Sequence, residues 1–340
     1  MNAKMKAAVW VGKEKIALQE VDVPKLKPGE VMIKIAYAGI CGSDLGIYAG
    51  KHPRAKAPLV MGHEFAGEII ETALLEGGDL KVGDRVTVNP LISCGVCQPC
   101  QTGHSHVCRN LGLVGIDCDG GFAEYVAVNA DRVVKVPPGM PLDIATLVEP
   151  VAVTVHALRR SNFKAGDTVV VLGGGPIGLL TAFSARYAGA SQVILSEISE
   201  QRLKLASDLG FTVVDAKQNP GQKILAMTGG DGADMVFEAA GVPETAALAT
   251  QITKITGQIV IVGVFKEPVP LDLQAVNFRE LSITGARVYT QKDFRIAITM
   301  LEREPGIASV ISHHLPLEKA EEGIRLILSG GNSMKVLLHP

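Results

Sequence analysis

Four residues in the first half of the chain could together bind a metal ion that does chemistry: Cys41, His63, Glu64 and Glu149. A thiolate, an imidazole and a carboxylate that leave one coordination position open are typical of catalytic zinc sites. Taken singly, each has a simpler interpretation. Cys41 fits a buried thiol in a turn, His63 a hydrogen-bonded core histidine with Glu64 as its counter-charge, and Glu149 an acid at a helix N-terminus. Only the set as a whole predicts a metal site.

A second group of sulfur ligands lies in a loop that contains glycine and proline: Cys94, Cys97, Cys100 and Cys108. Four thiolates close a tetrahedral shell and leave no open position, so this spacing predicts a structural zinc site. An iron-sulfur cluster is the rival interpretation, because ferredoxins also space cysteines by two residues. There the last cysteine usually precedes proline, whereas Cys108 precedes Arg109. Cys118 is left over and is interpreted as a packing residue.

Length and charge limit the classes of function. A chain of 340 residues is long enough for two domains. With 33 Lys and Arg against 35 Asp and Glu, the net charge is −2, which gives no electrostatic basis for holding nucleic acid or an anionic membrane. We therefore expect small-molecule partners.

The amino-terminal stretch leads from Met1 into charged residues and lacks the apolar core of a secretion signal. The most apolar region, residues 169–183, is interrupted by glycines and a proline, unlike a membrane span. These features predict a cytoplasmic protein, in which clustered cysteines act as metal ligands and not as disulfides.

Short alternating apolar runs at residues 7–11, 16–21 and 31–36, separated by proline and glycine, predict a mostly-β first domain. Glu149 precedes Pro150, which disfavours helical backbone before it and places its carboxylate at the start of the following helix.

From residue 168 the pattern alternates between strand and helix. A buried strand at 168–172 runs into a G-x-G-x-x-G turn and a helix, which predicts a dinucleotide site. A second strand ends in Glu197, whose carboxylate would accept hydrogen bonds from a ribose diol and repel a 2′-phosphate, so NAD is favoured over NADP. Arg202 could weaken that preference. The predicted cofactor contacts are Gly173, Gly175, Pro176, Ile177, Gly178, Glu197 and Arg202.

Further strands at 212–215, 234–238 and 258–263 imply an α/β fold with a doubly wound parallel sheet. Helices at 294–303 and 317–328 and strands at 310–313 and 335–339 complete the chain. We expect a catalytic domain of residues 1–152, completed by 287–340, and a cofactor domain of residues 153–286.

The order of these motifs resembles the zinc-dependent medium-chain dehydrogenases, over nearly the whole chain. The resemblance rests on residues 41–44, residues 62–64, the four-cysteine loop, residues 121–126 and the dinucleotide turn. It implies a GroES-like catalytic domain and a Rossmann domain, with one catalytic and one structural Zn²⁺ and NAD as cofactors. The metal would lower the pKa of the substrate hydroxyl, and hydride would pass to the nicotinamide.

The resemblance also implies roles for individual residues. Cys41 and His63 would bind the catalytic zinc, and the likeness is to the sorbitol, butanediol and threonine dehydrogenase branch, in which Glu64 or Glu149 supplies the further ligand. Ser43 is the candidate for passing on the hydroxyl proton, with turn capping as its alternative. The predicted substrate contacts are Tyr48, His52 and Tyr289, although Tyr48 and His52 also fit a loop surface.

One departure leaves the substrate open. Sorbitol dehydrogenases have a segment similar to Gly-x-Phe-Arg-Tyr, where this chain has Gly285-Ala286-Arg287-Val288-Tyr289. The arginine is displaced by one position, and in an extended segment that displacement turns its side chain to the other face. A secondary alcohol, a diol, a polyol, a phosphorylated polyol and an amino alcohol such as L-threonine all remain candidates.

Two other classes of function compete with the enzyme. A non-catalytic dinucleotide-sensing protein could keep the fold, but it has no need of an open metal site. A zinc-ribbon nucleic-acid binder built on the four cysteines lacks a basic, aromatic-rich face. The family often forms dimers or tetramers, so a homo-oligomer is expected, of undetermined number.

Overall fold

The computed structural model describes residues 3–74, 78–330 and 333–340, so Met1 and Asn2 of the amino-terminal stretch lie outside the described residues. The chain forms two compact units, Met1–Glu149 with Ile311–Pro340, and Pro150–Val310. The predicted return to the first domain was at residue 287, whereas the second unit continues to Val310. The reason is α10 (Gln291–Arg303), whose buried Asp293 accepts hydrogen bonds from His156 and Arg159 of the second unit.

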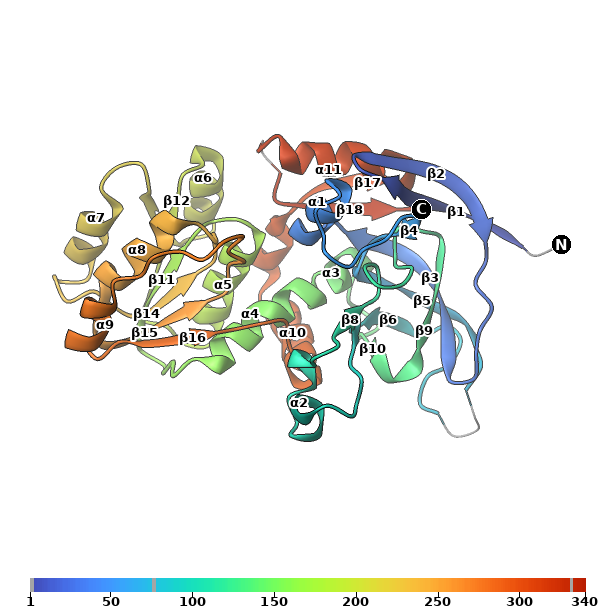
Figure 1. Cartoon of the computed structure of the whole chain (residues 1–340), viewed down its shortest axis with the longest axis horizontal. Helices are drawn as coiled ribbons and strands as arrows, with labels where there is room; N and C mark the ends of the chain where they lie inside the picture. Colours follow the sequence, from blue (N-terminus) through green and yellow to red (C-terminus); the bar gives the residue numbers. More distant parts are fainter. Residues whose placement is uncertain (1–2, 75–77, 331–332) are drawn as a thin grey trace. The chain divides into compact units, whose positions relative to one another are not determined.

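The first unit is mostly β, as the alternating runs predicted (Figure 1). One sheet has the order β2-β1-β4, formed by β2 (Lys15–Asp22), β1 (Lys4–Gly12) and β4 (Leu59–Val60). The larger sheet runs in the order β10 (Val133–Lys135), β6 (Arg85–Val88), β5 (Glu64–Thr72), β3 (Glu30–Gly39), β18 (Lys335–His339) and β17 (Ile311–Pro316), with β9 (Tyr125–Asn129) also paired to β3. The short β7 (Leu91–Ile92) pairs with β8 (Gly112–Leu113).

Strand register brings three distant segments of the first unit together. Gly39, at the end of β3, lies opposite Glu64 at the start of β5 and opposite Leu337 of β18. The residues that follow β3, those around the start of β5 and those that open β18 therefore meet at one place.

Short helices complete the first unit. They are α1 (Gly42–Tyr48), α2 (Gln98–Gln101), α3 (Leu142–Thr146) and α11 (Ala320–Leu328), with 3₁₀ turns η1 (Ser105–Val107), η2 (Ala130–Arg132) and η4 (Leu317–Lys319). Figure 1 shows α11 beside α1 and along β17 and β18, in agreement with their contacts.

The second unit holds the predicted parallel sheet, in the order β13 (Thr212–Asp215), β12 (Gln192–Glu197), β11 (Thr168–Leu172), β14 (Ala233–Glu238), β15 (Thr253–Ile261) and β16 (Ser282–Gly285). Its helices are α4 (Val148–Arg160), which begins in the last residues of the first unit, α5 (Pro176–Tyr187), α6 (Glu200–Asp208), α7 (Pro220–Met227), α8 (Pro243–Ile252), α9 (Leu273–Phe278) and α10, with the 3₁₀ turn η3 (Pro305–Val310). The strand order reverses between β11 and β14, which is where such sheets bind nucleotides.

The helices of the described part of the chain include none that is both long and apolar enough to cross a membrane.

We expect Gly178→Ala to lower the free energy of unfolding by about 1–3 kcal/mol, the usual cost of overpacking. A Cβ at Gly178 would overlap the carbonyl oxygen of Gly173 and force α5 away from β11. Gly175→Ala is the matched control, because the nearest atom to its Cβ is Arg202 Nη1 at 3.7 Å. Thermal unfolding of both variants tests this, and equal melting temperatures would contradict the packing argument.

Candidate functional site: two thiolate sites and a nucleotide cavity

The first unit brings three of the four predicted catalytic ligands into one group. Cys41, His63 and Glu64 each offer a ligand atom, and these atoms all lie within 4.8 Å of one another. Cys41 is the N-cap of α1, and His63 and Glu64 open β5. Gly62 has a φ of +93°, and a Cβ there would overlap the ring of Phe122. The glycine therefore lets the chain turn into the site beneath that ring.

The electrostatics of this group favour a cation. His63 is buried, and burial alone would lower its pKa, but Cys41, Asp44 and Glu149 raise that pKa well above its usual value. The same negative potential favours a divalent metal ion. With a thiol, an imidazole and carboxylates as donors, the residues fit zinc.

Asp44 belongs to this site, although the sequence analysis gave it no role. Its Oδ2 accepts a hydrogen bond from the backbone N–H of Cys41 at 2.8 Å, and its Oδ1 lies 3.8 Å from Nδ1 of His63. Burial is the main cause that raises the pKa of Asp44 to about 6. At 3.8 Å, Oδ1 of Asp44 and Nδ1 of His63 are not hydrogen-bonded, so Asp44 acts on His63 through its negative charge. The signal in the sequence was the capping box that Cys41 and Asp44 form at the start of α1.

Lys335 is a second residue that the sequence analysis missed. Its Nζ donates to both carboxylate oxygens of Glu64, at 2.8 and 2.7 Å, and to the carbonyl oxygen of Ile40 at 3.2 Å. Both members of this ion pair are buried, Lys335 at 3% exposure and Glu64 at 1%. No local pattern in the sequence connects them, because they lie 271 residues apart.

Glu149 and Ser43 complete the predicted set. Glu149 is 6% exposed in the first turn of α4, and it affects the pKa of both His63 and Lys335. The Oγ of Ser43 is buried and has no hydrogen-bond partner among the described residues. A buried hydroxyl of this kind usually has a partner, so one supplied by a bound ligand is consistent with the predicted proton transfer.

The four cysteines of the loop also form one group. Cys94, Cys97, Cys100 and Cys108 have their Sγ atoms within 4.8 Å of one another. The Sγ of Cys97 lies 3.4 Å from that of Cys100 and 3.8 Å from that of Cys108. A tetrahedron with Zn–S bonds of about 2.3 Å has sulfur atoms about 3.8 Å apart, so the cluster fits zinc. Backbone N–H groups of Arg109 and Cys100 lower the pKa of Cys97 to about 6, which favours the thiolate.

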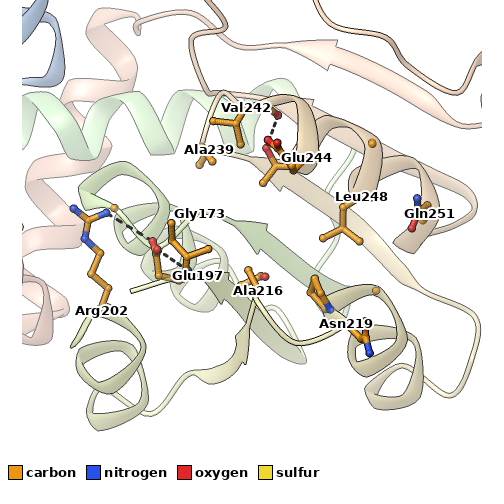
Figure 2. Close-up of a pocket in the computed structure, with 18 of the residues that line it drawn as sticks. Gly173, Glu197, Arg202, Ala216, Asn219, Ala239, Val242, Glu244, Leu248 and Gln251 are labelled. Atoms are coloured by element: carbon orange, nitrogen blue, oxygen red, sulfur yellow. Dashed lines mark hydrogen bonds and ion pairs between the residues drawn. The ribbon is translucent and has the colours of Figure 1, made fainter. Parts of the chain in front are cut away.

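The second unit contains a cavity of about 1070 Å³ over the ends of its strands. Its lining includes Gly173, Gly175, Glu197 and Arg202 of the predicted cofactor set. Figure 2 shows Arg202 reaching from α6 toward Glu197, with Asn219 and Leu248 farther along the cavity wall. Pro176, Ile177 and Gly178 form the first turn of α5, whose backbone N–H groups are suited to a pyrophosphate.

Glu197 is tied to the backbone more closely than the sequence suggested. Its oxygens accept hydrogen bonds from the N–H groups of Gly174 at 2.7 Å, Ile198 at 2.7 Å and Ser199 at 2.9 Å. Arg202 Nη1 lies 3.7 Å from the same carboxylate. Glu197 is therefore held rigidly at the cavity edge, with Arg202 partly neutralising it.

The other wall of this cavity, which the sequence did not predict, comes from the residues after β13 and β14: Asn219, Pro220, Ala239, Ala240, Val242, Glu244, Thr245 and Leu248. The sequence could have indicated these residues, because they directly follow two predicted strands that are consecutive along the chain. Parallel strands end at the same edge of a sheet, where the ligand binds.

The three predicted substrate contacts have different surroundings. Tyr48 is buried, and its hydroxyl accepts a hydrogen bond from Nε of Arg325 on α11 at 3.2 Å. Tyr289 is fully buried and packs edge-on against Phe294, so its ring serves the packing of α10. His52 is half-buried, and its Nδ1 accepts hydrogen bonds from the N–H groups of Arg54 and Ala55 at 3.4 and 3.2 Å.

Comparisons with known proteins identify the two domains. Residues 27–138 match the alcohol dehydrogenase GroES-like domain, and residues 176–303 match the zinc-binding dehydrogenase domain. L-threonine 3-dehydrogenase of Bacillus subtilis is 39% identical over 352 residues, covering 100% of this chain and 99% of the relative. The crystal structure of 2R,3R-butanediol dehydrogenase from Bacillus subtilis has a TM-score of 0.92 at 33% identity, covering 99% of each chain. An alcohol dehydrogenase structure from Escherichia coli CFT073, complexed with NADH, has a TM-score of 0.92 at 31% identity and covers 100% of each chain.

Zinc content should separate the two metal sites. We expect the wild-type protein to hold two zinc ions per chain, and His63→Ala and Cys97→Ser to hold one each. Cys97→Ser should also unfold at a lower temperature, because metal binding contributes folding free energy at a structural site. Elemental analysis after dialysis measures the content. Cys118→Ser is the control and should keep both ions; a second ion retained in His63→Ala would exclude His63 as a ligand.

Proposed function

This chain belongs to the zinc-dependent medium-chain dehydrogenase family, and from that premise we propose that it transfers hydride between NAD and a secondary alcohol with a second polar group on the neighbouring carbon. The family and the dehydrogenase activity follow from the comparisons. The ligand atoms of Cys41, His63 and Glu64 lie within 4.8 Å of one another, which supports the proposal that the reaction takes place at this group. A diol, a polyol or L-threonine meets the description of the substrate.

Cys41, His63 and either Glu64 or Glu149 would hold the catalytic zinc, and the four-cysteine loop the structural zinc. Zinc, when bound, lowers the pKa of a hydroxyl group that it contacts, and NAD, when bound, accepts the hydride. Asp44 would add negative charge beside His63, because its Oδ1 lies 3.8 Å from Nδ1.

Ser43 is the proposed acceptor of the substrate's hydroxyl proton. Its buried Oγ can accept one hydrogen bond and donate another, and the described protein groups use neither capacity. It follows Cys41 by two residues at the start of α1, so it lies close to one of the metal ligands.

His52 is the proposed partner of the second polar group of the substrate. Because its Nδ1 accepts two backbone N–H groups, the ring proton must lie on Nε2, which is then a donor. Burial, followed by the charges of Arg54 and His63, lowers the pKa of His52 and keeps the ring neutral. Arg54 itself forms a two-point ion pair with Asp117, with N–O distances of 2.9 and 3.0 Å. A neutral donor of this kind suits a hydroxyl or amino group better than a phosphate.

In the second unit, the cavity beside Gly173 and Glu197 would bind NAD. A carboxylate at this position favours a free ribose diol over a 2′-phosphate, and the neighbouring Arg202 reduces that preference. The cytoplasmic location predicted from the sequence stays a prediction.

We also propose a homo-oligomer formed through β16. This strand ends the sheet, and its outer edge has no partner strand among the described residues. Ile283 on β16 is 40% exposed, and Leu273 and Phe278 on the neighbouring α9 are 70% and 75% exposed. An open strand edge beside apolar side chains is self-complementary, so a second copy can pair with it about a two-fold axis.

A substrate panel tests the activity. Zinc-loaded protein with NAD should oxidise at least one of 2,3-butanediol, sorbitol and L-threonine with a higher kcat/KM than 2-butanol, measured as NADH absorbance. His52→Leu should reduce that ratio about fivefold, the effect of one neutral hydrogen bond of about 1 kcal/mol. Failure to oxidise any alcohol would favour the dinucleotide-sensing alternative, and an unchanged ratio would remove His52 from the substrate site.

Light scattering after size exclusion tests the oligomer. We expect the wild-type protein to be a dimer or a tetramer, and Ile283→Lys with Phe278→Glu to shift it to smaller species, because charge on a strand edge opposes pairing. Val82→Lys is the control, since Val82 is 59% exposed in a loop of the other unit. A monomeric wild-type protein would contradict the proposal.

A further inference from the structure

Asp117 has no role in the function proposed above, although it pairs with Arg54 in the loop that holds His52. Its two carboxylate oxygens accept hydrogen bonds from Nε and Nη2 of Arg54, at 2.9 and 3.0 Å. The side chain of Arg54 is 39% exposed and that of Asp117 is 27% exposed. A surface ion pair contributes little to stability, but a two-point contact fixes geometry, because the guanidinium group is a rigid fork. The pair is therefore better suited to holding a loop in place than to stabilising the fold.

The loop in question, residues 51–58 between α1 and β4, contains no helix or strand. At its start, the backbone N–H of His52 donates to the carbonyl oxygen of Gly46 in α1 at 3.1 Å. The ring of His52 then accepts, through Nδ1, the backbone N–H groups of Arg54 and Ala55. The orientation of the ring thus depends on where the backbone of Arg54 and Ala55 lies.

Asp117 is itself held by the hairpin that closes the four-cysteine loop. Its Oδ2 accepts a hydrogen bond from the N–H of Leu113 at 2.8 Å, and its own N–H donates to the carbonyl oxygen of Leu113 at 2.8 Å. Leu113 lies on β8 and pairs with Leu91 on β7, and these two strands flank residues 94–108 in the sequence. Asp117 is therefore a fixed point against which Arg54 is held.

The charges of the pair also act on the ring. Burial lowers the pKa of His52 and the charge of Arg54 lowers it further, whereas the charge of Asp117 opposes the effect of Arg54. The charge of His63 contributes as well, so the ring lies within electrostatic reach of the candidate metal site. Because the two charges of the pair oppose each other at the ring, the pair acts on His52 chiefly through geometry.

We propose that Asp117 is a positioning residue for the substrate: through Arg54 it holds the turn at residues 52–55, and this turn directs Nε2 of His52 toward the second polar group of the substrate. The inference rests on the proposed function of His52. Loss of the carboxylate would free Arg54, and the turn and the ring would then move together, because Nδ1 is bonded to the backbone of that turn. A misplacement of about 1 Å is enough to lose a productive contact.

Steady-state kinetics of the zinc-loaded protein with NAD test the proposal. The measured ratio is kcat/KM for the best substrate among 2,3-butanediol, sorbitol and L-threonine, divided by kcat/KM for 2-butanol. We expect Asp117→Asn and Arg54→Lys each to lower this ratio about threefold, part of the effect expected for His52→Leu. The decrease should come from a higher KM for the polar substrate, with the constants for 2-butanol unchanged within a factor of about two.

Two further variants separate positioning from a general structural role. Arg132→Lys is the matched control, because Arg132 pairs with Asp131 at 3.8 Å in the same unit, and it should keep the wild-type ratio. Asp117→Asn should have no further effect in the His52→Leu protein, which lacks the ring through which Asp117 acts. A further decrease there, an equal decrease for both alcohols, or a wild-type ratio in Asp117→Asn and Arg54→Lys would each overturn the proposal.

Nitrogen NMR of the histidine rings gives a second measurement, which does not depend on activity. The signals of His52 are those that the His52→Leu protein lacks, and in the wild-type protein they should show the ring proton on Nε2. Asp117→Asn should give a mixture of the two tautomers, because the released ring no longer caps the turn, whereas Arg132→Lys should not. Unchanged His52 signals in Asp117→Asn would overturn the proposal. A wild-type kinetic ratio in His52→Leu is a different outcome, which would reject the proposed function of His52 itself.

Discussion

The candidate metal site of the first unit depends on one buried ion pair, between Glu64 and Lys335. Glu64 and Lys335 are almost wholly withdrawn from water, and each would be costly to bury alone. Their pairing joins β5, near the beginning of the chain, to β18 at its end. The carboxyl-terminal segment therefore does more than extend the sheet, because it supplies the countercharge that makes a carboxylate tolerable beside the metal ligands.

Glycines provide the space that these polar groups occupy. Gly39 admits the carboxylate of Glu64, and Gly62 admits the ring of Phe122 beside His63. In the second unit, Gly178 allows α5 to approach the carbonyl oxygen of Gly173. In each case a side chain would displace a polar group or a ring that the site requires, which explains why glycine accompanies the chemistry along the sequence.

The two units use different chemistry for their ligands. The first unit concentrates acidic side chains, Cys41, Asp44, Glu64 and Glu149, around one imidazole, and that environment favours a divalent cation. The second unit relies on backbone N–H groups at the start of α5 and on one carboxylate, Glu197, whose oxygens are held by three backbone N–H groups. Hydride transfer needs both a Lewis acid and a held dinucleotide, and each unit contains the residues for one of them.

The sequence by itself determined the features whose residues lie close together along the chain. The four-cysteine loop, the turn from β11 to α5 and the alternation of strands and helices were all predicted, because a short spacing or a period of two or 3.6 residues encodes each of them. Tertiary structure alone decided which distant residues meet. Lys335 pairs with Glu64 across 271 residues, Tyr289 is buried by the packing of α10, and α10 extends the second unit to Val310. These outcomes follow from strand order, register and side-chain packing, which hydrophobic periodicity does not specify.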